Sequence, residues 1–171
     1  LRVDPGVMAL LGFRPEAWLD ASVALTDRIH PGDADLATQL FAPVSVPWSG
    51  SCHLRVRCAD GRIICVRADH HAHRDGDEVL LDLVLHDARA LPRTMERASS
   101  SGSLAAMLEN ADDFIYFKDR NHVFTGASQS LLALCTPPPQ RTDLLGLTDY
   151  DVFPEAYADI YYRLEKDVFA G

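Results

Sequence analysis

Alternating hydrophobic and polar positions mark residues 51–85 as sheet-forming. Apolar residues alternate with polar ones over 51–58 and 62–70, on either side of Asp60-Gly61, a dipeptide that favours a tight hairpin turn. Asp75-Gly76-Asp77 forms a second turn signal before the apolar run 79–85. The pattern therefore predicts a three-stranded antiparallel sheet.

Helical signals precede this sheet. Residues 5–11 are typical of a strand turning into a short helix that ends at Gly12. Pro15–Leu19 predicts a helix with proline in its first turn, and 33–40 predicts another, capped by Asp33. The first part of the chain thus combines short helices with an antiparallel sheet, which is an α+β arrangement.

A second hairpin begins after residue 110. The apolar run Phe114 to Phe117 meets a polar turn over 118–121, and a second strand, His122 to Thr125, follows. A helical run then ends near Cys135, and another helix begins near Pro154. This region is also predicted to be α+β.

Between these regions, apolar residues recur at helical spacing. They are Leu91, Met95, Ala98, Leu104, Met107 and Leu108, interrupted by the serine-rich stretch 99–103. Two interpretations stay open: a helix that joins two modules and packs along a partner helix, or a helix lying on its own module. We therefore expect a first module over 1–89, a helical linker over 90–109 and a second module over 110–171.

Both modules carry motifs that resemble the PAS family. In the second, Tyr-Phe-Lys-Asp at 116–119 and Gly-x-Thr-x-x-Asp-x-x-Pro at 146–154 are similar to the front half of one PAS subset. In the first, GVMALLGFRPEAW at 6–18, Ile-His-Pro-Gly-Asp at 29–33 and LRVRCADGRIICV at 54–66 resemble the corresponding motifs of another subset. Cys65 stands where that subset usually has tryptophan.

The resemblance implies two PAS-like modules, each an antiparallel sheet with helices on one face. It also leads us to expect that the first module lacks its opening strand and the second its last three strands. Leu1 in place of an initiator methionine suggests a piece of a longer protein. PAS domains are sensor and dimerisation modules. The resemblance therefore implies a homodimeric sensory region of a bacterial signalling protein, with a histidine kinase or cyclic-dinucleotide enzyme as output domain outside this chain.

A small cavity in the second module is the candidate ligand site. Its predicted wall consists of Phe114, Tyr116, Phe124, Leu132, Leu145, Tyr157 and Tyr161. In haem-binding relatives the resemblance would place an axial histidine on the helix over 157–168, which contains none. The Asn-Cys-Arg-Phe-Leu-Gln motif of photoactive flavin modules is also missing from the sequence. No cofactor is predicted, and an unidentified small ligand remains open.

Charge and composition narrow the function classes. A net charge of -9 with scattered basic residues argues against a nucleic-acid surface. No apolar run approaches the roughly 18 residues of a membrane helix. Cys52, Cys58, Cys65 and Cys135 lack any disulfide or zinc spacing. We therefore expect free thiols and a cytoplasmic protein.

Catalysis finds little support in the sequence. It lacks a Gly-x-Ser-x-Gly elbow and a glycine-rich phosphate loop, so we expect no enzyme within this chain. His70, His71 and His73 leave one enzymatic alternative, a metal site, although a solvated strand end is the favoured explanation of these histidines. A ligand-free interaction module is the other alternative. Thr148 and Asp149 either cap a helix or lie at the mouth of the cavity.

Overall fold

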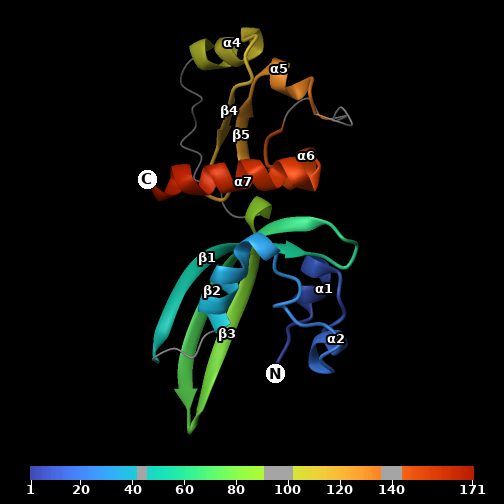
Figure 1. Cartoon of the computed structure of the whole chain (residues 1–171), viewed down its shortest axis with the longest axis vertical. Coiled ribbons are helices and arrows are strands. Elements are labelled where there is room, and N and C mark those ends of the chain that lie inside the picture. The colour runs from blue at the N-terminus through green and yellow to red at the C-terminus, as the bar shows by residue number, and fades with distance from the viewer. Residues whose placement is uncertain (42–45, 91–101, 136–143) are drawn as a thin grey trace. The chain divides into compact units, whose positions relative to one another are not determined.

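The structure is a computed structural model that describes residues 1–41, 46–90, 102–135 and 144–171. The chain divides into two compact units, Leu1–Ala88 and Arg89–Gly171 (Figure 1). Each unit combines antiparallel strands with helices, so the predicted α+β class is confirmed. None of the helices in the described ranges is long and apolar enough to cross a membrane.

The first unit places short helices before a three-stranded sheet. Its elements are α1 (Gly6–Leu11), α2 (Pro15–Leu19), η1 (Pro31–Asp33), α3 (Ala34–Phe41), β1 (Trp48–Arg57), β2 (Ile63–Asp75) and β3 (Glu78–Asp87), and η2 (Ala88–Ala90) follows. The strands are antiparallel in the order β1-β2-β3. This confirms the predicted sheet, with strands longer than expected.

The two turns of this sheet depend on glycine. Arg57 pairs with Ile63 around the first turn, and Asp75 pairs with Glu78 around the second. Gly61 (φ 88°) and Gly76 (φ 62°) both adopt left-handed backbone, which is strained for residues with a Cβ. The Asp-Gly signals therefore located the turns correctly.

The helices of the first unit pack against one face of this sheet. Leu11 of α1, Trp18 of α2 and Leu40 of α3 form a buried core with side chains of β1 and β2, among them Leu54, Val56, Ile64, Val66 and Ala68. Gly12 ends α1 in a left-handed conformation (φ 80°), as predicted. The expected strand before α1 does not form, because the backbone at Pro5 is already helical.

The second unit is built around a two-stranded hairpin. Its elements are α4 (Gly102–Asn110), β4 (Tyr116–Lys118), β5 (Phe124–Ala127), α5 (Gln129–Leu132), α6 (Asp149–Val152) and α7 (Glu155–Ala170). Figure 1 shows α7 running across the hairpin. Both strands begin two residues later than expected, and the pairing shifts between Phe117 and Lys118. Of the expected linker, α4 covers the end, while residues 91–101 lie outside the described ranges.

Candidate functional site

The first unit contains a pocket of about 470 Å³ between α3 and the loop before it. Its wall is formed by Thr26, Asp27, Ile29, His30, Pro31, Ala34, Ala37, Thr38 and Phe41. The α3 members recur at positions i, i+3, i+4 and i+7, which places them on one face of the helix. The lining is mostly apolar with a few polar groups, and the volume lies within the usual range for small-molecule sites.

A buried ion pair fixes the loop side of this pocket. Asp33 accepts two hydrogen bonds from the Arg55 guanidinium, from Nε at 2.9 Å and from Nη2 at 2.9 Å. The Asp33 carboxylate also accepts the backbone N–H of Arg55 at 3.0 Å. The two side chains are 0% and 5% exposed. Asp33 therefore anchors the 29–33 turn to β1, and a role of its side chain in capping α3 stays a prediction.

Gly32 is required beside this ion pair. A Cβ at this position would lie 2.5 Å from Arg55 Nη2. His30, two residues earlier, accepts the backbone N–H of Gly32 through its Nδ1 atom at 3.1 Å. The His-Pro-Gly-Asp motif thus forms a tight turn whose backbone approaches the guanidinium closely.

The predicted histidine trio is not brought together. His71 and His73 stack on one face of β2, with ring centroids 5.4 Å apart. His70 points to the other face and stacks against Trp48 at 4.0 Å. Successive residues of a strand face opposite sides of the sheet, so the three histidines cannot share one metal ion. The three histidines therefore do not form one ligand set, and the enzymatic alternative stays untested.

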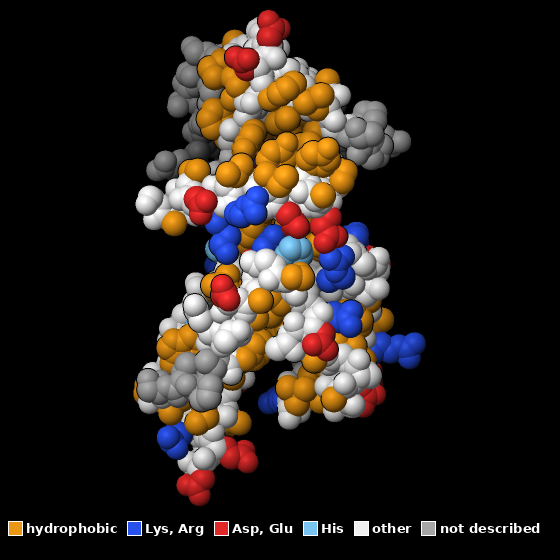
Figure 2. Space-filling model, in the orientation of Figure 1, with side chains coloured by type: hydrophobic (Ala, Val, Ile, Leu, Met, Phe, Trp, Pro, Cys, Tyr) orange, Lys and Arg blue, Asp and Glu red, His pale blue; other side chains and the backbone are white. Residues whose placement is uncertain are grey.

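The seven residues of the predicted ligand pocket lie in different environments in the second unit. Phe124 is 1% exposed, while Leu132 and Tyr161 are half-buried. Phe114, Tyr116, Leu145 and Tyr157 are exposed to between 42% and 59%. Figure 2 shows many hydrophobic side chains at the surface of this unit. The described residues therefore show Phe124 as core and leave the role of the other six as a prediction.

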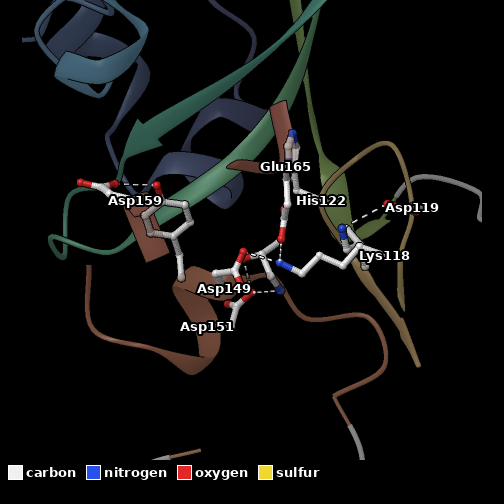
Figure 3. Close-up of polar contacts among 10 residues, drawn as sticks. Lys118, Asp119, His122, Asp149, Asp151, Asp159 and Glu165 are labelled. Atoms are coloured by element: carbon white, nitrogen blue, oxygen red, sulfur yellow. Dashed lines mark hydrogen bonds and ion pairs between the residues drawn. The ribbon is translucent and has the colours of Figure 1, made fainter. Parts of the chain in front are cut away.

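Four polar side chains from three parts of the second unit meet inside it, and we call them the buried polar cluster: Lys118, His122, Asp149 and Glu165 (Figure 3). Lys118 Nζ donates to Asp149 Oδ2 and, at 2.5 Å, to Glu165 Oε1. The other oxygen of Glu165 lies 2.8 Å from His122 Nδ1. All four side chains are at most 10% exposed.

The local backbone positions each member of the cluster. Lys118 ends β4, and His122 occupies a left-handed turn position (φ 63°). The turn is closed by Asp119, whose carboxylate accepts the N–H groups of Asn121 and Val123. Asp149 begins α6, and Glu165 lies on the inner face of α7. The cluster therefore joins the hairpin to both helices.

Aromatic rings surround the cluster and exclude water from it. Lys118 Nζ lies 4.2 Å from the ring centroid of Phe124 and 5.5 Å from that of Tyr116. The His122 ring packs against Tyr162 at 4.1 Å and against Phe169 at 5.2 Å. In such surroundings a cation gains from the negative faces of the rings, but an ionised carboxylate loses its hydration.

Burial raises the pKa of Asp149 from 3.8 to about 6. Lys118 opposes this effect, and the negative charge of Glu165 adds to it. His122 also lowers the pKa, but burial is the largest effect, so protonation of Asp149 is favoured relative to an aspartate in water. Such a group titrates in the range of many biological pH changes.

Asp149 is not the helix cap that the sequence suggested. Thr148 is the N-cap residue of α6, and Asp151 Oδ2 accepts its N–H at 2.9 Å and its hydroxyl at 2.8 Å. The local capping interactions thus come from Thr148 and Asp151. The Asp149 carboxylate instead forms its ion pair with Lys118.

Sequence reasoning missed Lys118, His122 and Glu165, which form the buried polar cluster with Asp149. One signal was present: Glu165 continues the buried face of α7, which also carries Ala158 and Tyr162. A charged residue on an apolar helix face indicates a buried partner. The interacting pairs of the cluster are separated by 31 to 47 positions in the sequence and could not be identified by spacing.

Comparison with known proteins gives one result for the first unit. Residues 1–84 match the family model described as PAS fold. No curated protein matches the chain.

Proposed function

Because residues 1–84 form a PAS domain, we propose that this chain is a sensory region that binds a small ligand in its first unit and regulates an output domain of the parent protein. PAS domains suggest a sensory or regulatory role, and this family membership carries the proposal. In finer detail, we propose a cytoplasmic bacterial signalling protein whose output is a histidine kinase or a cyclic-dinucleotide enzyme.

The 470 Å³ pocket beside α3 supports ligand binding by the first unit. Its apolar members suit a small organic molecule, and Asp27, His30 and Thr38 offer polar contacts that would orient it. The Asp33–Arg55 ion pair keeps one wall rigid, so little ordering entropy is lost on binding. The sequence motifs argue against haem and flavin, and we propose a ligand without either chromophore.

To transmit the signal, a conformational change in the first unit would have to reach the C-terminal end of that unit. The third strand ends at Asp87 and continues into η2 and the region before α4. A ligand that binds two conformations with different affinities would shift their populations, and α4 would carry the change into the second unit. We propose that the same region holds the protein as a homodimer.

The ligand proposal can be tested by thermal-shift screening of the purified chain with small metabolites. Both tryptophans, Trp18 and Trp48, lie in the first unit, so tryptophan fluorescence follows its unfolding. Thr38→Trp narrows the pocket, and Gln39→Trp, on an exposed α3 position outside the pocket lining, is the matched control. A ligand that stabilises the control but not Thr38→Trp supports the site. Equal stabilisation of both variants contradicts it.

A ligand-free interaction module remains the second candidate. It is favoured by the exposed hydrophobic side chains of the second unit, which include Phe114 at 58% and Tyr157 at 59% exposure. This candidate predicts self-association without any ligand effect in the thermal-shift screen.

A further inference from the structure

The buried polar cluster ties the hairpin of the second unit to α6 and α7 through ionisable groups. Lys118 donates to carboxylates on both helices, and His122 holds the second oxygen of Glu165. The strength of this attachment therefore depends on the protonation state of the cluster.

We propose that the buried polar cluster is a proton-controlled lock: uptake of one proton by Asp149 tightens α6 and α7 onto the hairpin, and its loss loosens them. The proton comes from solvent and forms an O–H bond on the Asp149 carboxylate, which removes one buried negative charge. Lys118 then balances Glu165 alone. This property belongs to the second unit and holds whether or not the first unit binds a ligand.

The charges around Asp149 support this direction. Lys118 of β4 faces it directly, and Glu165 of α7 lies on the other side of the same ammonium group. His122 of the turn and the phenol of Tyr116 also interact electrostatically with Asp149, Tyr161 of α7 interacts with Tyr116, and the described part of β5 carries no charged residue. On α6 itself, Asp151 is paired with Arg89 at 2.8 Å.

The ionised form of Asp149 is buried beside a second carboxylate, Glu165, while Lys118 and His122 lower its pKa. Burial and Glu165 both disfavour this state, and the pKa of Asp149 rises to about 6 in consequence. Opening of the cluster returns Asp149 to water, where its pKa is near 3.8. Local opening therefore becomes easier as the pH rises through about 6.

Hydrogen exchange of the α7 amides measures this opening. The two pKa values predict that the opening equilibrium increases about tenfold between about pH 5 and about pH 7.5, after correction for the intrinsic exchange rate. Asp149→Asn should remove this pH dependence. Asp167→Asn, which neutralises an exposed position on the same helix, should retain it. Wild-type protection that does not change with pH, or a dependence that persists in Asp149→Asn, would overturn the proposal.

A second readout does not require the Asp149→Asn variant to fold. Carbon-13 NMR of the Asp149 carboxyl group in the wild-type chain should give a titration midpoint near 6. Glu165→Gln removes the neighbouring negative charge and should move that midpoint to lower pH. A wild-type midpoint near the ordinary aspartate value, or a midpoint that Glu165→Gln leaves unchanged, refutes the lock.

Discussion

Removal of the lysine from the buried polar cluster should strongly destabilise the second unit at neutral pH. Lys118→Met keeps most of the side-chain volume but leaves Asp149 and Glu165 facing each other without their shared cation. The three side chains are 3%, 4% and 10% exposed, so the cost is that of a broken buried ion pair and not that of a surface pair. We expect a loss of about 3–5 kcal/mol in the free energy of unfolding.

The loss should shrink as the pH falls. Without Lys118, protonation is the remaining way to discharge the two carboxylates, so the variant should approach the wild type at mildly acidic pH. All five tyrosines lie in the second unit and both tryptophans in the first, so tyrosine and tryptophan fluorescence during urea unfolding can follow the two units separately. The effect should appear in the tyrosine signal.

Two further variants test the reasoning behind this prediction. Arg163→Met removes a positive charge from an exposed position of α7 and should change stability by less than about 0.5 kcal/mol. Lys118→Met combined with Asp149→Asn should recover part of the loss at neutral pH, because one buried charge is gone. A stability loss in Lys118→Met as small as that of Arg163→Met, or a loss that does not depend on pH, would refute the assignment of Lys118 as the charge partner of both carboxylates.

Three other predictions concern separate features. Asp149→Asn should remove a pH dependence of stability. Because the pKa of Asp149 is raised to about 6, protonated Asp149 contributes about 3 kcal/mol to the free energy of unfolding below about pH 4, and this contribution is lost as the pH rises through about 6. Urea unfolding measures it as the difference between the wild type and the variant. Asp33→Ala should leave Arg55 buried without its carboxylate and lower stability by about 3–5 kcal/mol in the tryptophan signal; an effect below about 1 kcal/mol would contradict the anchoring role. The purified protein should be colourless and sediment at twice the chain mass; a haem or flavin absorption band in stoichiometric amount, or a monomer at micromolar concentration, would contradict these expectations.

The local parts of the fold could be predicted from the sequence because they depend on neighbouring residues. The Asp-Gly turns at 60–61 and 75–76, the end of α1 at Gly12 and the helix after Pro154 all follow from backbone preferences over a few positions. Element boundaries were less accurate. The hairpin strands of the second unit start two residues later than the apolar run suggested, and their pairing is irregular between Phe117 and Lys118.

The polar interactions within each unit could not be predicted, because they join residues far apart in the chain. Asp33 looked like a helix cap, and its ion-pair partner Arg55 lies 22 positions away on β1. Asp149 also looked like a cap, but Thr148 and Asp151 form the capping interaction of α6. The Asp149 carboxylate accepts a hydrogen bond from Lys118 instead. The alternation of side chains along a strand separates His70 from His71 and His73 without any tertiary information, and the ring contacts in the structure agree with it.

The most direct test of the sensory role is the output activity of the parent protein with and without a ligand found by the thermal-shift screen. Kinase autophosphorylation or cyclic-dinucleotide synthesis would be measured in the wild type and with Thr38→Trp or Gln39→Trp in the first unit. We predict that the ligand changes output in the wild type and in Gln39→Trp, but not in Thr38→Trp. Output that stays the same in the wild type while the ligand is bound would contradict a sensory function for this region.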